Sequence, residues 1–248
     1  MNLIIIHPHE PDNEGRVHLS GVRAAHIQSV LRAVPGKELR IGLLNGPLGR
    51  GTVAEIHGKE VVLRCEFSGE IPSRPAIDLL LALPRPKVMK RLWAQLAALG
   101  VGRIILTNAE KVERYYFDSH VLDPDFYTGL LIDGLQQAGD TRLPKVQVVR
   151  ELKPFLEDEL DGIFPQAGTR LLADPSGARN IFQTLEKAGT ANRLLAVGSE
   201  GGWTPYELEM FSARGFRIFN AGPRILRTDT ACIALLSLLT LCSGTNEK

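Results

Sequence analysis

Short apolar runs separated by polar turns mark the first part of the chain, and one amphipathic stretch interrupts them. The runs predict β-strands at residues 3–6, 39–43, 52–56 and 61–67, with a turn at His57-Gly58-Lys59. The amphipathic stretch, residues 21–34, predicts a helix that ends before Pro35 and Gly36. Its buried side is expected to carry Val22, Ala25, Val30 and Val34. A few strands around one helix favour a small β-barrel.

The pattern changes after residue 71. Ile-Pro-Ser-Arg-Pro at residues 71–75 is a stiff, polar connection, and it predicts a boundary between a first domain at residues 1–72 and a second at residues 76–248. Residues 78–83 form a continuous apolar run, which is typical of a strand buried on both faces. A helix is expected from about Lys87 to Gly100, with Leu92, Trp93, Leu96 and Leu99 at helical spacing. Further strands, at residues 103–107, 170–173, 194–197 and 216–219, alternate with helical stretches and predict a parallel α/β sheet.

Composition narrows the possible functions. The 29 Lys and Arg residues nearly balance the 28 Asp and Glu residues. The protein has almost no net charge to attract a nucleic acid, so a nucleic acid would have to bind a local basic surface. The three cysteines form no Cys-x-x-Cys pair, and we therefore expect neither a disulfide scaffold nor a metal site. The N-terminal apolar run is too short for a signal peptide, and no run is long enough to span a bilayer. A cytoplasmic protein without membrane partners is expected.

A glycine-rich turn follows the strand at residues 194–197. Its sequence, Gly-Ser-Glu-Gly-Gly from Gly198, would bring bare backbone to the carboxyl edge of the sheet, where open α/β folds bind ligands. Thr204, Pro205 and Glu207 then predict a capping box and the start of a helix. The turn lacks the dinucleotide and phosphate-loop fingerprints, and Glu200 would repel phosphate, so an NAD-type oxidoreductase is disfavoured. When this turn is taken alone, a capped crossover helix with no ligand is the favoured interpretation.

A second loop follows the strand at residues 216–219. It reads Asn-Ala-Gly-Pro-Arg-Ile-Leu-Arg-Thr-Asp-Thr over residues 220–230, and Gly-Pro interrupts any regular element there. Residues 231–241 form a helix that is apolar around nearly its whole circumference and must be buried in a core or against another subunit. Thr228 or Asp229 could serve simply as the cap of that helix, with Arg227 as a surface charge.

Together these two loops resemble the signature of the uridine-N3 methyltransferases of small-subunit ribosomal RNA, members of the knotted SPOUT superfamily. The matching segments are Gly-Ser-Glu-Gly-Gly-Trp-Thr-Pro-x-Glu-Leu from Gly198 and Gly-Pro-Arg-Ile-Leu-Arg-Thr-Asp-Thr-Ala from Gly222. Weaker similarity covers nearly all the rest of the chain, at residues 26–32, at Leu99-Gly100-Val101, and at Gln137, Gly139 and Pro144.

The resemblance implies a PUA-like β-barrel followed by an α/β domain with a C-terminal trefoil knot. It also implies S-adenosylmethionine as cofactor, a homodimer, and small-subunit ribosomal RNA, in the assembled subunit, as substrate. The cofactor is expected to contact Ala173, Gly198, Glu200, Gly201, Gly222, Ile225, Leu226 and Arg227. Arg227 and Glu200 are the expected catalytic residues, and RNA contacts are expected from Arg23, His26, Arg32, Arg85 and Lys87.

The chemistry of uridine supports the role given to Arg227. N3 must lose its proton before it can accept a methyl group, and the resulting charge spreads onto the flanking carbonyl oxygens, where an arginine would stabilise it. Asp229 is a less favoured candidate for the base. Two alternatives stay open: a related SPOUT enzyme acting on transfer RNA or a ribose hydroxyl, and a non-catalytic RNA-binding relative. The second is kept open by Gln136 and Asp140, which depart from the central motif.

Overall fold

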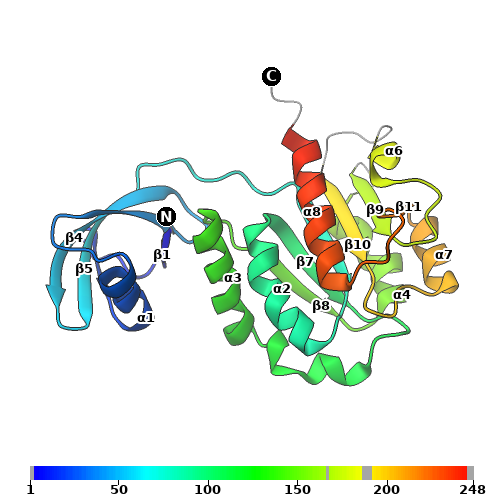
Figure 1. The fold of residues 1–248 in the computed structure, drawn as a ribbon, viewed down its shortest axis with the longest axis horizontal. Helices are drawn as coiled ribbons and strands as arrows, with labels where there is room; N and C mark the ends of the chain where they lie inside the picture. Colours follow the sequence, from blue (N-terminus) through cyan, green and yellow to red (C-terminus); the bar gives the residue numbers. More distant parts are fainter. Residues whose placement is uncertain (1–2, 166–167, 186–191, 245–248) are drawn as a thin grey trace. The chain divides into compact units, whose positions relative to one another are not determined.

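The computed structural model describes residues 3–165, 168–185 and 192–244, and the chain divides into two compact units. Unit 1 comprises Met1–Arg74 together with Ile132–Leu143, and unit 2 comprises Pro75–Leu131 and Pro144–Lys248. The sequence placed residues 132–143 with the second part of the chain. Figure 1 colours the elements of both units in chain order.

Unit 1 is built on a five-stranded sheet in the order β1-β3-β4-β5-β2. Only β1 and β3 are parallel, and the other pairs are antiparallel. Apolar side chains from all five strands share one core with Ala24 and Ile27. The strand at residues 16–19 was not expected from the sequence because its alternation of exposed and buried positions is only four residues long. The strands are β1 (Ile4–Ile6), β2 (Arg16–Leu19), β3 (Glu38–Leu43), β4 (Leu48–His57) and β5 (Glu60–Glu66).

The expected buried face of the first helix is wrong. The residues predicted to be buried, Val22, Ala25, Val30 and Val34, are all exposed. An α-helical turn, α1 (Gly21–Ala25), passes into a π-helix, η1 (His26–Val30), and the core receives Ala24 and Ile27 instead. Ile27 removes more apolar surface from water than any one of the valines would, and the wider π-turn changes which residues share a face.

Residues 132–143 join unit 1 through hydrogen bonds. The Leu3 amide donates to the Gln136 carbonyl (2.9 Å), and the buried Thr141 hydroxyl donates to the Gly46 carbonyl (2.6 Å). Asp140, one of the departures from the central motif, accepts the backbone N–H groups of Thr141 and Arg142. In this chain the segment that carries the central motif therefore packs against the rest of unit 1.

Unit 2 contains a six-stranded sheet in the order β11-β9-β10-β6-β7-β8, and every described pair is parallel. The expected parallel α/β sheet is confirmed, and β8 is a strand that the sequence analysis did not predict. The central strand β10 is buried at all five positions, and Leu195 lies between Leu79 and Leu171 of its neighbours. The strands are β6 (Ile77–Ala82), β7 (Val101–Thr107), β8 (Lys145–Val149), β9 (Thr169–Ala173), β10 (Arg193–Val197) and β11 (Arg217–Phe219).

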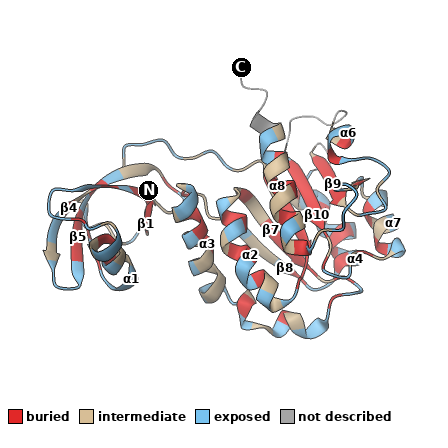
Figure 2. Cartoon of the chain, viewed as in Figure 1, coloured by how far each residue is buried: buried red, intermediate tan, exposed pale blue. Residues whose placement is uncertain are grey.

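Helices cover this sheet, and α2 and α8 lie side by side across its central strands (Figure 1). Figure 2 shows the central strands β9 and β10 of this sheet as almost entirely buried. The principal helices are α2 (Pro86–Ala98), α3 (Pro124–Ala138), α7 (Pro205–Ala213) and α8 (Thr228–Gly244). Shorter helical segments are η2 (Arg114–Asp118), η3 (His120–Leu122), α4 (Leu152–Pro154), η4 (Phe155–Glu159), α5 (Leu160–Ile163) and α6 (Ile181–Leu185).

Two of these helices match their sequence signals closely. The α2 helix buries Leu92, Trp93 and Leu96 as expected, and Gly100 after it adopts φ +73°, the left-handed conformation that ends a helix. In α8, Cys232, Leu235, Leu236 and Leu239 are buried within the unit. None of the helices in the described ranges has the length and apolar character needed to cross a membrane.

Candidate active site

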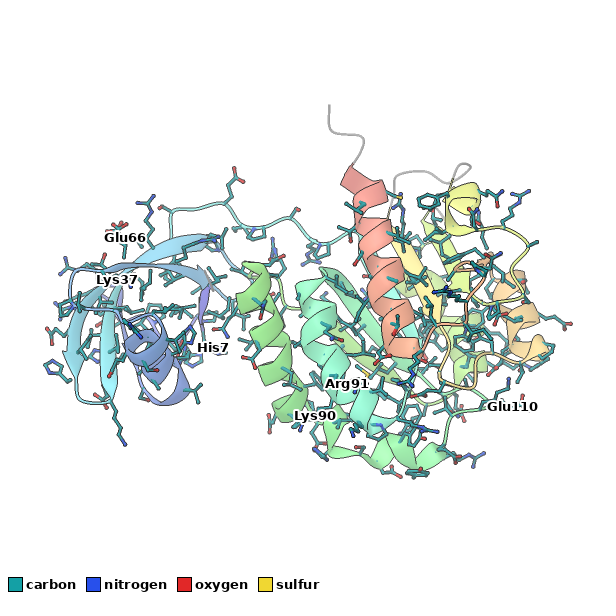
Figure 3. The ribbon with its side chains drawn as sticks, viewed as in Figure 1. His7, Lys37, Glu66, Lys90, Arg91 and Glu110 are labelled. Carbon is teal, nitrogen blue, oxygen red and sulfur yellow. The ribbon has the colours of Figure 1, made fainter. Side chains whose placement is uncertain are left out.

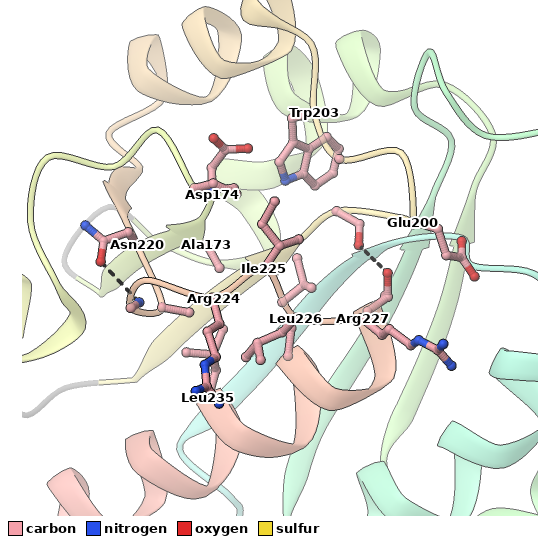
Figure 4. Close-up of a pocket in the computed structure, with 18 of the residues that line it drawn as sticks. Ala173, Asp174, Glu200, Trp203, Asn220, Arg224, Ile225, Leu226, Arg227 and Leu235 are labelled. Atoms are coloured by element: carbon pink, nitrogen blue, oxygen red, sulfur yellow. Dashed lines mark hydrogen bonds between the residues drawn. The ribbon is translucent and has the colours of Figure 1, made fainter.

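A cavity of about 740 Å³ opens at the carboxyl ends of β9, β10 and β11 (Figure 4). Three loops and the first turns of α8 form its walls. This is the edge of a parallel sheet at which open α/β folds bind ligands. The lining residues are Ala173, Asp174, Pro175, Asn180, Val197, Gly198, Ser199, Glu200, Gly202, Trp203, residues 220–228, Ala231 and Leu235.

The loop after β10 turns tightly before it enters α7. A side chain at Gly198 would come within 3.1 Å of the Gly202 Cα, and Gly202 itself has φ +67°. Thr204 then caps α7: its hydroxyl accepts the Glu207 N–H, and the Glu207 carboxylate accepts the Thr204 N–H at 2.7 Å. The predicted capping box is confirmed, and it fixes where the glycine turn ends.

The loop after β11 is tied to the loop after β10. Gly222 adopts φ +110° and donates its N–H to the Asn220 side chain (3.2 Å), and the Thr228 hydroxyl donates to the Gly198 carbonyl (3.2 Å). Both bonds are drawn in Figure 4. Because α8 begins at Thr228, neither Thr228 nor Asp229 stands before the helix as its cap. The Asp229 carboxylate accepts a hydrogen bond from Arg91 of α2 (2.8 Å) instead.

The loop after β9 crosses the end of β11 at very short range. The Asp174 N–H donates to the Phe219 carbonyl (3.0 Å), the Asn220 N–H donates to the Arg179 carbonyl (2.8 Å), and the Asn220 side chain donates to the Gly177 carbonyl (2.6 Å). A Cβ on Gly177 would lie 2.3 Å from the Phe219 carbonyl carbon, so the crossing requires glycine. Three segments that are distant in sequence thus form one rigid wall.

The residues predicted to contact a cofactor gather in this cavity, with one exception. Ala173, Gly198, Glu200, Gly222, Ile225, Leu226 and Arg227 all line it. Gly201 lies outside the lining: its Cβ position faces the side chain of Lys111 at 2.8 Å, and its carbonyl accepts the Lys111 ammonium at 2.9 Å. The missing side chain at Gly201 therefore makes room for a lysine and not for a ligand.

The sequence did not predict several of the residues that line this cavity. Asp174, Asn180, Ser199, Trp203 and Asn220 all face the cavity. Asp174 and Asn220 follow directly after their strands, so the rule that parallel strands present ligands at their carboxyl ends would have found them. Trp203 and Asn180 carried no comparable signal because their loops are positioned by tertiary contacts.

The cavity combines apolar surface with polar groups that lack partners. Val197, Leu226 and Leu235 supply apolar wall, while the buried Ser199 hydroxyl and Trp203 indole N–H have no hydrogen-bond partner among the described residues. Buried polar groups of this kind are normally satisfied, so they favour a ligand with polar atoms of its own. In Figure 4 the side chains of Glu200 and Arg227 extend to the same side of the cavity. The Glu200 carboxylate accepts the Arg85 N–H at 3.2 Å.

The sequence also matches known families and proteins. Residues 72–240 match the RNA methyltransferase domain family. The chain is 31% identical to the ribosomal RNA small subunit methyltransferase E of Treponema pallidum over 88% of its own length and 82% of that protein. The chain belongs to the ribosomal RNA small subunit methyltransferase E family. The family predicted from the two loops is thus confirmed.

Other members of the family and solved structures agree. The methyltransferase E 1 of Borreliella burgdorferi is 26% identical over 94% of this chain and 95% of that protein. The Neisseria gonorrhoeae methyltransferase E, crystallised with S-adenosyl methionine, has the same fold, with a TM-score of 0.76, 20% identity and 98% of each chain covered. The Legionella pneumophila methyltransferase Lpg2936, solved with bound SAM, also has a TM-score of 0.76, at 22% identity and 98% coverage of each chain.

The residues predicted to bind RNA lie in both units, and they differ in how far their side chains are exposed and engaged in contacts within the protein. In unit 2, Arg85 and Lys87 are exposed at the start of α2. In unit 1, Arg32 is exposed and has a positive φ of 47°, and His26 is half-buried. Arg23 is engaged internally, because its guanidinium pairs with Glu10 and donates to the Ile5 carbonyl (3.2 Å). Burial of the Glu10 carboxylate raises its pKa, but the hydrogen bonds from Arg23 and from the His7 N–H together outweigh burial, and the Glu10 pKa is lowered overall.

Proposed function

We propose that this protein transfers a methyl group from S-adenosylmethionine to N3 of a uridine in small-subunit ribosomal RNA. The observation that carries the proposal is the cavity itself, which is built from the two loops that resemble the uridine-N3 signature and is closed by the loop after β9. The named relatives are small-subunit ribosomal RNA methyltransferases, and solved proteins of this fold were crystallised with the same cofactor.

The residues present fit S-adenosylmethionine. The apolar surface of Val197, Leu226 and Leu235 suits an adenine ring, and the exposed backbone of residues 221–225 offers hydrogen-bonding groups at close range. The carboxylates of Asp174 and Glu200 suit ribose hydroxyls and a sulfonium cation. The residues assigned to the cofactor are therefore Ala173, Asp174, Gly198, Glu200, Trp203, Gly222, Ile225, Leu226 and Arg227.

The cofactor, when bound, supplies an electrophilic methyl group on a positively charged sulfur. The protein has to hold the uracil in line and to stabilise the negative charge that develops on its carbonyl oxygens once N3 has lost its proton. Arg227 is the residue we assign to that charge, and Glu200 lies on the same side of the cavity. Asp229 is less suited to act as the base because its carboxylate is paired with Arg91.

The larger architecture extends this proposal. Five strands that share one core support a PUA-like barrel in unit 1, as predicted for the domain at residues 1–72. The crossing of residues 174–180 over the end of β11 supports a trefoil knot within the methyltransferase domain at residues 76–248. Exposed apolar side chains at Ile225 and Leu241 support a homodimer that covers them. We place the enzyme in the cytoplasm, acting on RNA within the assembled small subunit.

The test is methyl transfer from labelled S-adenosylmethionine to intact small subunits and, side by side, to naked ribosomal RNA. Mass spectrometry of the nucleosides should show 3-methyluridine, formed faster on the intact subunits. A methylated ribose, or a product formed only on transfer RNA, would support the related SPOUT activities. Cofactor binding without any transfer to RNA would support a non-catalytic relative.

A further inference from the structure

A second cavity, of about 310 Å³, opens at the same edge of the sheet in unit 2. We call it the Asn108 cavity. It is lined by Asn108, Ala109, Glu110, Val112 and Arg114 after β7, by Leu152 after β8, and by Tyr206, Glu207 and Met210 of α7. Its volume lies at the lower end of the range for sites that bind small organic groups, about 300–1,000 Å³.

One segment of chain connects the two cavities. Residues 198–200, 202 and 203 line the cofactor cavity, and Tyr206 and Glu207, a few residues later, line the Asn108 cavity. The Glu207 carboxylate holds both sides together, because it accepts the N–H of Thr204 (2.7 Å) and the N–H of Glu110 (2.8 Å). The Asn108 cavity is therefore linked to the cofactor cavity through the segment that joins β10 to α7.

The Asn108 cavity offers two side chains that can accept hydrogen bonds. The Asn108 side-chain oxygen is closed to solvent and has no hydrogen-bond partner among the described residues, although the Asn108 N–H is satisfied by the Val149 carbonyl. A buried acceptor without a donor is costly. The last torsion of an asparagine side chain is soft, so the carboxamide can turn toward a ligand that brings a donor. The exposed carboxylate of Glu110, labelled in Figure 3, adds a second acceptor.

An aromatic ring and a cation complete the lining. Tyr206 is 55% exposed, although it lies on α7 next to the buried Glu207. Arg114 is exposed where η2 begins. Exposed aromatic rings that stack on unpaired bases, together with arginines that meet phosphates, are the usual means of binding single-stranded RNA.

We propose that the Asn108 cavity binds a base of the substrate RNA close to the methylated uridine, and that this base is guanine. The inference rests on the proposed function. Guanine presents two adjacent donors, N1–H and the N2 amino group, and these match the Asn108 oxygen and the Glu110 carboxylate. Uracil presents one N–H between two carbonyl oxygens, which would face those same acceptors. Stacking on Tyr206 would hold the base, and Arg114 would meet its phosphate.

The first test is steady-state methyl transfer to intact small subunits. Tyr206→Ala and Asn108→Leu should each raise KM for the subunits about ten-fold, with kcat and the Kd for S-adenosylmethionine unchanged. Tyr206→Phe and Asn108→Asp, which keep the ring and the acceptor, should retain most of the affinity. Phe182→Ala is the matched control, because Phe182 is an equally exposed aromatic residue (56%) outside both cavities. Wild-type KM in both Tyr206→Ala and Asn108→Leu would overturn the inference.

The second test identifies the base. Small subunits reconstituted with RNA that contains 6-thioguanosine or 4-thiouridine are irradiated with the enzyme, and cross-linked peptides are found by mass spectrometry. Thioguanosine should label peptides that contain residues 108–114 or 206–210. Labelling of these peptides by thiouridine alone, or labelling only elsewhere in the chain, would refute the assignment to guanine.

The two proposals fail in different ways. If the wild-type protein does not methylate the subunits, the proposed function fails. If it methylates them with KM unaffected by both substitutions, the function stands and only the role of the Asn108 cavity fails.

Discussion

Replacing Gly177 by alanine tests how the wall of the active site is held. The added Cβ would lie 2.3 Å from the Phe219 carbonyl carbon, 2.5 Å from the Asn220 nitrogen and 2.6 Å from the Phe219 Cα. All three atoms belong to the backbone, so no side chain can rotate away, and the loop after β9 must move off β11. The hydrogen bonds of Asp174, Asn220 and the Gly177 carbonyl that hold this crossing would then break.

The expected loss follows from those bonds. Three hydrogen bonds at about 1 kcal/mol each give a decrease of about 3 kcal/mol in the free energy of unfolding. Because Asp174 and Asn220 line the cavity, the affinity for S-adenosylmethionine should fall as well. Urea denaturation and titration calorimetry measure the two effects.

A second glycine provides the control. Gly129 lies within α3, is exposed, and has nothing within 4 Å of its Cβ position. Gly129→Ala should therefore raise stability by about 0.5–1 kcal/mol, because alanine favours the helix. A Gly177→Ala protein with wild-type stability and wild-type cofactor affinity would refute the reasoning about the crossing.

Three further changes test the site and its surroundings. Arg227→Ala should lower kcat about 100-fold or more at saturating S-adenosylmethionine; full methyl transfer with cofactor binding intact would remove Arg227 from the chemistry. Burial raises the pKa of the Cys65 thiol to about 11 and that of Cys232 to about 12. At pH 8 iodoacetamide should therefore label Cys242 before either of them in mass spectra of the native protein, and rapid labelling of Cys232 would show that α8 opens. Burial also raises the pKa of Asp78, so the folded state favours its protonated form, and that stabilisation is lost as pH rises through the folded pKa. Asp78→Asn should remove this part of the pH dependence in denaturation curves from pH 4 to pH 8, and unchanged curves would contradict it.

The parts of the fold that the sequence predicted are those with a local signal. Strand β10 and its neighbours are buried on both faces and therefore appear as continuous apolar runs. The capping box of α7 depends only on residues three positions apart. In contrast, β2 is short and half exposed, and the role of Gly201 depends on Lys111, which is 90 residues away in the chain. The packing of residues 132–143 into unit 1 also depends on partners far away in sequence.

The π-helix shows a second reason why the sequence alone could not predict the fold completely. The sequence of residues 21–34 contains two apolar stripes, and periodicity alone cannot choose between them. One stripe contains the valines that turned out to be exposed, and the other contains Ala24 and Ile27, which are buried. The choice is made by the curled sheet, because the core that the strands enclose contains Ala24, Ile27 and Ala33 and none of the valines of this segment.

At the start of α8, two residues that the sequence identifies as possible helix caps form hydrogen bonds that shape the site instead. Thr228 and Asp229 have side chains well suited to capping, yet the Thr228 hydroxyl bonds to Gly198 and the Asp229 carboxylate bonds to Arg91. The Arg227 carbonyl accepts the first helical hydrogen bond, from the Ala231 N–H at 2.8 Å. The Arg227 backbone is therefore fixed by its own helix, while the two residues after it are held by the β10 loop and by α2. This anchoring sets, before the substrate arrives, the backbone position from which the exposed Arg227 side chain reaches the developing charge.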